Sequence, residues 1–224
     1  MRRTVEVGYA RGTETRDRIL NVAIQLFGNY GFDSVTTREI AAQSDVPPAS
    51  LRYYFVNKEG LYIACLEHVQ TLTFKLLEGE LEATEALLAQ DNVDADRLIE
   101  SFCAMQDARI DSLMGGPDNG AAALFTIRHD LPSTGGAGKL GSMHADARRM
   151  MDCYLQVLSR ISGNKVDLQS ALIITGMISG QIVNLFLRRN RLAEMGWEVT
   201  PERIAWLKAT SRQQTTAILK SYQA

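Results

Sequence analysis

A short segment around residue 50 carries the side chains with the clearest capacity for chemistry. The Pro47-Pro48 pair can sit only at or before the first turn of a helix, so it predicts a helix over residues 48–54. If Leu51 faces a protein core, a rotation of about 100° per residue points Ala49 and Tyr53 the opposite way. The segment is therefore expected to present a methyl group and a phenol on its outer face.

The side chains around this outer face suit double-stranded DNA. Arg52 flanks the face and can bond both acceptors of a guanine in the major groove, while Ala49 can contact a thymine methyl group. Tyr54 and Lys58 are better placed for backbone phosphates. The alternative is a packing helix whose arginines are simply solvated. The expected DNA contacts are Thr36, Thr37, Arg38, Pro48, Ala49, Ser50, Arg52, Tyr53, Tyr54 and Lys58.

Two more helices are predicted upstream of this segment. Apolar residues at helical spacing, followed by Gly31 as a stop signal, predict a helix over residues 13–30. Thr36 and Glu39 have the spacing of a capping box and open a second helix over residues 37–43, whose N-terminal hydroxyls and free N–H groups suit a phosphate. Two short helices joined by a three-residue turn indicate a helix-turn-helix motif.

At this motif the chain resembles a known family. The DNA-binding segment of TetR-type transcriptional repressors is similar to residues 36–62, TTREIAAQSDVPPASLRYYFVNKEGLY, and the resemblance is close over about residues 13–65. The YYF…KEGLY pattern, the length and the late GQIVNLFLRR…GW stretch resemble the subgroup with a CerR- or CecR-like C-terminal domain. The resemblance implies a dimer that senses a ligand through its C-terminal domain.

Three features of this segment depart from the family pattern. The turn residue is Asp45 instead of the usual Gly, and Arg52 replaces the usual Tyr three residues before the Phe. The Pro47-Pro48 pair stands where Ser-x is more common. Aspartate tolerates the left-handed conformation, though less well than glycine. These changes are compatible with the fold, but they prevent the operator sequence from being inferred by analogy.

Composition and charge agree with an all-α intracellular protein. The 224 residues are 46% hydrophobic and 22% charged, and helical periodicity extends over most of the chain. Residues 1–58 hold eight Lys and Arg against six Asp and Glu, a net charge of +2, so the remainder carries −4 of the total of −2. This asymmetry favours a nucleic-acid surface at the N-terminal end. Without an apolar leader run, a cytoplasmic location is expected.

The sequence predicts two domains. Residues 1–57 form a three-helix helix-turn-helix domain with a flexible basic arm over residues 1–12, and residues 58–224 form a helical bundle for ligand sensing and dimerisation. Beyond the long helix that starts at Lys58, the predicted helices span residues 94–113, 119–130, 138–162, 167–191 and 200–221, giving about nine in all. The apolar run 171–187 is interrupted by polar residues, so we expect a buried helix there.

Glycines in the predicted helix 167–191 indicate a subunit interface. Gly176 and Gly180 form a GxxxG pattern that lets another helix approach closely, and the helix 200–221 completes half of an intersubunit four-helix bundle. The alternative is a helix buried within one subunit. The expected interface residues are Gly176, Gly180, Val183, Ile204, Leu207 and Ile218.

Soft, aromatic and polar residues on the middle helices predict a ligand cavity for an apolar or aromatic molecule. Arg128 and His129 would anchor its polar group, although they could equally cap the helix ending near residue 131. A constitutive or architectural regulator without an effector is the alternative function. The expected ligand residues are Met105, Arg109, Phe125, Arg128, His129, Met150, Met151, Tyr154, Met177 and Gln181.

Catalytic and metal chemistry have little support in the sequence. No Gly-rich phosphate loop and no GxSxG motif occurs, and the three histidines lack an acidic residue at metal-motif spacing. The remaining metal alternative combines His129, His144 and Asp146. Three cysteines without CxxC spacing argue against a disulfide scaffold. We therefore expect no enzyme and no cofactor.

Overall fold

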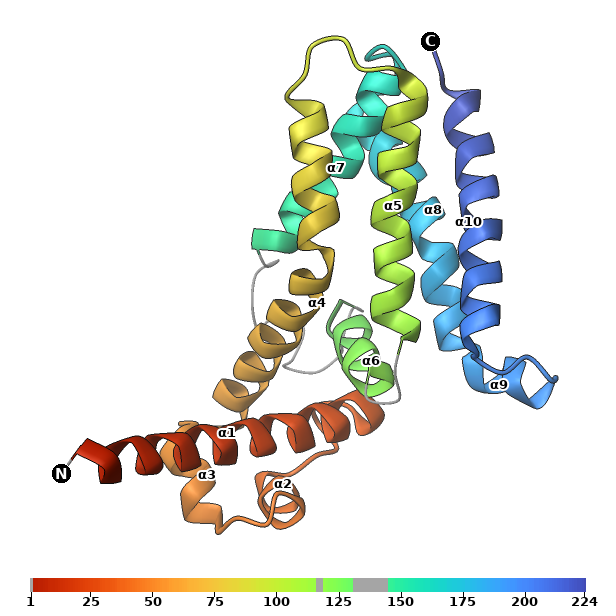
Figure 1. Ribbon diagram of the computed structural model, residues 1–224. Helices are drawn as coiled ribbons and strands as arrows, with labels where there is room; N and C mark the ends of the chain where they lie inside the picture. The colour runs from red at the N-terminus through yellow and green to blue at the C-terminus, as the bar shows by residue number, and fades with distance from the viewer. Residues whose placement is uncertain (1, 116–118, 131–144) are drawn as a thin grey trace. The chain divides into compact units, whose positions relative to one another are not determined.

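The computed structural model describes residues 2–115, 119–130 and 145–224, with the side chains of residues 12–115, 120–130 and 145–224. These residues form ten α-helices and no strand (Figure 1), which confirms the all-α prediction. The count exceeds the expected nine because the predicted helix 167–191 is interrupted at Arg188. The two resulting helices are α8 (Leu168–Leu187) and α9 (Arg189–Glu194).

The helices group into two units by their contacts. The first unit contains α1 (Arg2–Tyr30), α2 (Thr37–Gln43), α3 (Pro48–Tyr54), the part of α4 (Lys58–Leu88) up to residue 72, and α6 (Asn119–Asp130). The second contains the rest of α4, α5 (Ala95–Met114), α7 (Ala145–Ile161), α8, α9 and α10 (Pro201–Ser221). The sequence placed the residues of α6 with the C-terminal bundle, whereas α6 packs against α1.

One predicted helix start differs from the structure. The sequence predicts a flexible arm over residues 1–12, whereas the structure has α1 helical from Arg2. Extending an existing helix by one residue costs far less than nucleating a new one, so two interior glycines do not end it. Helix α7 begins at Ala145. The predicted start at 138 and the predicted breaks at 116–117 and 131–136 lie outside the described residues.

Four aromatic rings form the centre of the first unit. Tyr62 of α4 contacts Phe27 of α1 and Phe125 of α6, with ring centroids 5.3 and 4.8 Å apart. Phe32, in the loop after α1, packs edge-on against Tyr62 at 5.1 Å. Burying each ring removes a large apolar area from water, and edge-to-face pairs add further stabilisation. This cluster joins α1, α4 and α6 into one core.

The backbones of α1 and α6 touch at a glycine. A Cβ atom built on Gly28 would lie 2.3 Å from the carbonyl oxygen of Ala121. Nearby, the Arg128 guanidinium donates a hydrogen bond of 3.3 Å to the carbonyl oxygen of Asn29 near the end of α1. Gly28 therefore sets how closely α6 approaches α1.

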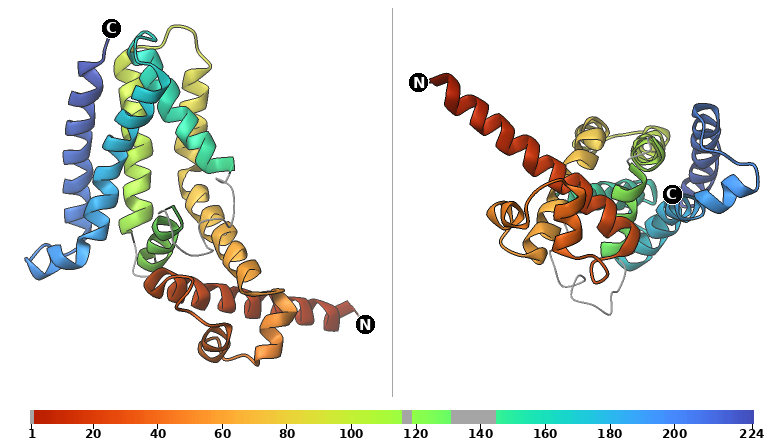
Figure 2. Two further views of the ribbon diagram at one scale, coloured as in Figure 1. Left: turned by 180° about the vertical axis from the view of Figure 1, so that it is seen from behind. Right: turned by 90° about the horizontal axis from the view of Figure 1, so that it is seen from below.

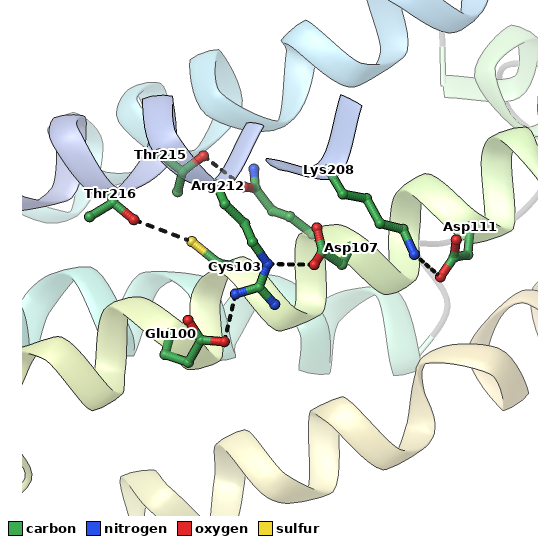
Figure 3. A network of polar contacts seen from close by, with 9 residues as sticks. Glu100, Cys103, Asp107, Asp111, Lys208, Arg212, Thr215 and Thr216 are labelled. Atoms are coloured by element: carbon green, nitrogen blue, oxygen red, sulfur yellow. Dashed lines mark hydrogen bonds and ion pairs between the residues drawn. The ribbon is translucent and has the colours of Figure 1, made fainter. Parts of the chain in front are cut away.

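Ion pairs connect α10 to α5 in the second unit. The two helices run side by side (Figures 1 and 2), and cationic side chains of α10 point toward carboxylates spaced along α5 (Figure 3). Arg212 donates to Asp107 at 2.6 Å and to Glu100 at 2.5 Å, and Lys208 pairs with Asp111 at 2.5 Å. Below them the core contains Phe102 and other buried apolar residues. The ion pairs set which face of α10 meets α5.

Helix α8 buries only one side, which corrects the expectation of a fully buried helix. Its inward positions are Ala171, Thr175, Ile178, Ile182 and Phe186. Among the described residues it is the one helix long and apolar enough to cross a membrane, but only 28% of that apolar window is buried. Exposed apolar side chains cover its other side, and such a surface on a protein usually meets a partner. They are Leu168, Leu172, Ile173, Met177 and Leu187.

We predict that Gly28→Ala lowers the free energy of unfolding by about 1–3 kcal/mol, because the new methyl group collides with backbone that cannot rotate away. Gly79→Ala is the matched control, since Gly79 lies inside α4 with nothing within 4 Å of its Cβ position. That change should stabilise the protein by up to about 1 kcal/mol. Urea unfolding followed by circular dichroism measures both. Equal stability of the two variants would contradict the close approach.

Candidate nucleic-acid interface and ligand pocket

The turn of the helix-turn-helix is a Schellman motif with aspartate at its left-handed position. Asp45 has a φ of 52°. The N–H of Val46 donates to the carbonyl of Ala41 at 3.0 Å, and that of Asp45 donates to Ala42 at 3.2 Å, which is the double bond pattern of this motif. Val46 packs against the core of the first unit. Asp45 therefore occupies the position where the family usually has glycine, and it does so in the strained conformation.

The predicted capping box at the start of α2 is present. The Thr36 hydroxyl accepts from the N–H of Glu39 at 3.2 Å, and the backbone N–H of Thr36 donates to the Glu39 carboxylate at 2.7 Å. The backbone and hydroxyl hydrogen bonds from Thr36 lower the pKa of that carboxyl below its usual value. The Thr36 hydroxyl is therefore engaged within the cap. Thr37 is half-buried, while Arg38 is exposed and makes no ion pair with any described residue.

Helix α3 presents the outer face that the sequence predicts. Leu51 is 2% exposed and Phe55 is buried with it, whereas Tyr53 is 84% exposed. Ala49 and Arg52 are also exposed, and the Arg52 guanidinium makes no hydrogen bond or ion pair with the residues that the structure describes. All its donors are therefore available to a ligand outside the protein.

Some of the remaining predicted DNA contacts on and beside α3 are half-buried or pack against other side chains of the protein. Ser50 and Tyr54 are half-buried, and the Tyr54 ring packs edge-on against Tyr53 at 5.2 Å. Pro48 is exposed at the first turn. The Lys58 ammonium lies 4.2 Å from the centroid of the Phe32 ring, a cation–π contact. Lys58 therefore also supports the core.

Asn57 is a structural residue that the sequence analysis missed. Its side-chain oxygen accepts a hydrogen bond of 2.7 Å from the N–H of Gly60 and caps the start of α4. An asparagine directly before a helix was the available signal. This cap fixes the start of α4 directly after α3.

A pocket of about 600 Å³ lies within the second unit, between α5, α7 and α8. Tyr154 of α7 lines it and is 1% exposed, and its hydroxyl has no hydrogen-bond partner among the described residues. Burial raises the pKa of this phenol, while the positive charge of Arg109 acts in the opposite direction. The lining residues are Arg109, Met150, Met151, Tyr154, Thr175, Gly176, Ser179, Gly180, Val183, Asn184, Leu187 and Arg188.

The structure brings some of the expected ligand residues together and separates others. Met150 and Met151 line the pocket with Arg109 and Tyr154. Met105 is fully buried in the core, and Met177 and Gln181 are exposed on α8 and do not line the pocket. The expected residues of α6 do not line this pocket and belong to the first unit: Phe125 is in its aromatic core, Arg128 bonds the end of α1, and His129 lies 3.5 Å from the Tyr62 hydroxyl.

The expected interface residues also occupy different places. Gly176, Gly180 and Val183 line the pocket, and a Cβ atom on either glycine would meet open space. Leu207 is buried within its own unit, whereas the neighbouring Trp206 is 59% exposed. Ile204 and Ile218 are half-buried. The pocket lining on α8 could not be predicted from the sequence, because glycine, serine and asparagine on an apolar helix indicate close packing as readily as a cavity.

Among the described residues, no group of three His, Cys, Asp or Glu side chains is arranged to hold a metal ion. His144 of the alternative metal site lies outside those residues.

Comparison with known proteins identifies the helix-turn-helix. Residues 19–65 match the family described as bacterial regulatory proteins, tetR family. This segment therefore carries the DNA-binding domain of the TetR family. It is similar to the HTH-type transcriptional dual regulator CecR of Shigella flexneri, with 36% identity over 84 residues. That alignment covers 38% of this chain and 37% of CecR, so the chain matches little more than a third of the relative's length. Membership of a CerR- or CecR-like subgroup stays a prediction.

Two solved structures share the fold over nearly the whole chain. The complex of SmeT with triclosan has a TM-score of 0.59 at 18% identity and covers 91% of this chain and 90% of SmeT. The complex of AibR with isovaleryl coenzyme A and operator DNA has a TM-score of 0.59 at 16% identity, covering 92% and 98%. At these identities the likeness shows the fold alone.

We predict that Asp45→Gly raises the free energy of unfolding by up to about 1 kcal/mol, because glycine adopts the left-handed conformation without strain but loses more freedom on folding. Asp45→Val should lower it by about 1–2 kcal/mol. Asp33→Val, at an exposed turn residue outside the left-handed region, is the control and should change little. Thermal denaturation compares the three. If Asp45→Gly and Asp45→Val are equally stable, the assigned turn geometry is wrong.

Proposed function

We propose that this TetR-family protein is a homodimeric transcription regulator that binds a palindromic operator and leaves it when a small molecule enters the second unit. The observation that carries the proposal is the outer face of α3. Arg52 and Tyr53 are held outward by a buried Leu51, with no intramolecular partner for the guanidinium among the described residues. An unpaired, well-positioned arginine on a short helix is suited to bidentate contact with guanine.

The surroundings of α3 support binding to the DNA backbone as well. Arg38 is exposed and unpaired among the described residues, and Lys58 sits at the first turn of α4. Phosphate contacts by such cations supply affinity and orientation, while α3 supplies base preference. Thr37 is the remaining hydroxyl at the α2 N-terminus, because the hydroxyl of Thr36 is used in the capping box.

The exposed side of α8 supports a dimer. Ile173 and Met177 are more than half exposed and lie on the same side of the helix, and Trp206 exposes its ring on α10. A second copy of this surface would cover the apolar side chains and form an isologous interface. Two DNA-binding units held in this way fit the two half-sites of a palindrome.

The pocket of the second unit supports control by a small molecule. AibR and SmeT, which share the fold, were solved with isovaleryl coenzyme A and triclosan respectively. A ligand releases DNA only if it binds more tightly to the conformation whose DNA-binding units no longer match the half-sites. Helix α4 belongs to both units and is the natural carrier of that change. We place this activity in the cytoplasm, where the DNA is.

We expect Arg52→Ala to weaken operator binding by about 1–3 kcal/mol and to relax the preference at one base pair in each half-site. Lys58→Ala should weaken binding to all sequences alike and flatten the salt dependence. DNA duplexes that bind the wild-type protein are first selected from a random-sequence pool. Binding of each variant to these duplexes is then measured by fluorescence anisotropy. Arg97→Ala, at an exposed arginine of α5, is the control. Unchanged affinity and base preference for Arg52→Ala would remove α3 from the interface.

Replacement of Met177 by glutamate should convert the dimer into a monomer, because it puts a charge in the centre of the apolar surface. Met177 does not line the pocket, so this change leaves the cavity intact. Leu76→Glu, at an equally exposed leucine of α4, is the matched control and should remain dimeric. Sedimentation velocity measures the assembly. A dimeric Met177→Glu protein would move the interface away from α8.

A further inference from the structure

The pocket in the second unit is positively charged without internal compensation. Its lining includes Arg109 of α5 and Arg188 at the end of α8, and it includes no acidic residue. Neither guanidinium makes a hydrogen bond or ion pair with the described residues. Two other arginines of the same unit are paired: Arg149 donates two hydrogen bonds to Glu85, and Arg212 contacts two carboxylates. Arg109 is therefore a cation that the fold positions without supplying its counter-charge.

Tyr154 supplies a second polar side chain to the lining of this pocket. Its side chain is buried, it lines the pocket, and its hydroxyl is among the few buried polar atoms that lack a partner in the described residues. Burial raises the pKa of the phenol, so the hydroxyl stays protonated and can donate. A buried donor without a partner is costly, and an acceptor on a bound molecule would remove that cost.

The rest of the lining is apolar and contains free space. Met150 and Met151 contribute flexible thioether side chains from α7, and Val183 and Leu187 contribute alkyl surface from α8. The absence of side chains at Gly176 and Gly180 leaves room along α8, because nothing lies within 4 Å of their Cβ positions. A volume of about 600 Å³ is within the range of small-molecule sites.

We propose that the ligand of this pocket is a small amphipathic anion whose carboxylate, or an equivalent oxyanion, is held by Arg109 and the Tyr154 hydroxyl. Its alkyl or aryl body lies against the methionines of α7 and the glycine-lined side of α8. The role of this anion in releasing DNA rests on the proposed function, whereas its binding does not. Neutral molecules of the same shape bind less tightly because they leave the guanidinium without a counter-charge.

Matched probes test the charge requirement. Octanoate, decanoate and 4-butylbenzoate are compared with octanol, decanol and 4-butylbenzyl alcohol, and with decyltrimethylammonium, by isothermal titration calorimetry on the full chain. At least one carboxylate is expected to bind about tenfold or more tightly than its alcohol, which corresponds to a single charge-assisted hydrogen bond. If no carboxylate binds more tightly than its alcohol, the proposal is overturned.

Variants test the two anchors. Arg109→Met should abolish the advantage of the carboxylate over the alcohol while leaving alcohol binding unchanged. Tyr154→Phe keeps the ring and should weaken carboxylate binding several-fold. Arg148→Met, at an exposed arginine of α7 that does not line the pocket, is the control for a general loss of positive charge. A carboxylate preference that survives in Arg109→Met would assign the charge recognition to another residue and overturn the proposal.

Titration of selected DNA with the same unliganded samples separates this proposal from the proposed function. A wild-type protein that binds the selected DNA but shows no preference for carboxylates over alcohols overturns only the ligand assignment. Selective carboxylate binding by a protein that binds no selected DNA overturns only the proposed function.

Discussion

The packing of Phe125 against Phe27 and Tyr62 is the interaction on which the arrangement of the first unit depends. These rings come from α6, α1 and α4, three helices that are far apart in the chain, and each ring is almost completely buried. Helices α2 and α3 complete the same core through Ile40 and Leu51. The outward direction of α3 follows from this core, because Leu51 can be buried only if the opposite face is presented to solvent.

Local signals account for the parts of the fold that the sequence predicts well. The helix-turn-helix has a capping box, a proline at the first turn of α3 and a glycine with a φ of 83° after α1, and each acts within a few residues. Rotation along one helix then suffices to place Ala49 and Tyr53 opposite Leu51. Helix α1 is the exception, because the cost of extending a helix depends on the helix already formed rather than on a local stop signal.

Long-range packing accounts for what the sequence does not predict. The sequence around Phe125 has the apolar spacing of a helix, like the other helices in the middle of the chain. Nothing near Phe125 in the sequence indicates that its ring packs against α1 and α4. The close approach at Gly28 depends likewise on the Ala121 carbonyl, which is distant in sequence. On α8, the GxxxG pattern locates two residues without side chains. It does not show whether a neighbouring helix or a pocket lies beside them. Arg109 was among the expected ligand residues, whereas the neutral polar lining at Ser179 and Asn184 was not.

Charge has two different uses in the second unit. The paired cations of α10 meet partly exposed acids on α5, and such pairs each contribute at most about 1 kcal/mol. Their regular spacing selects the register of the two helices more than it stabilises them. Arg109, on the opposite side of α5 from this array, has no such partner among the described residues. Helix α5 thus carries both the carboxylates that pair with α10 and the arginine whose charge is available to a ligand.

The return of α6 to the first unit has a consequence for the order in which the protein matures. A ribosome that has delivered α1 to α4 has not yet made Phe125, so Phe27 and Tyr62 still lack one of their ring partners. The chain between Tyr62 and Phe125 includes all of α5, a helix of the second unit. The nascent first unit therefore remains incomplete, with apolar surface available to chaperones, until α5 of the second unit has been synthesised.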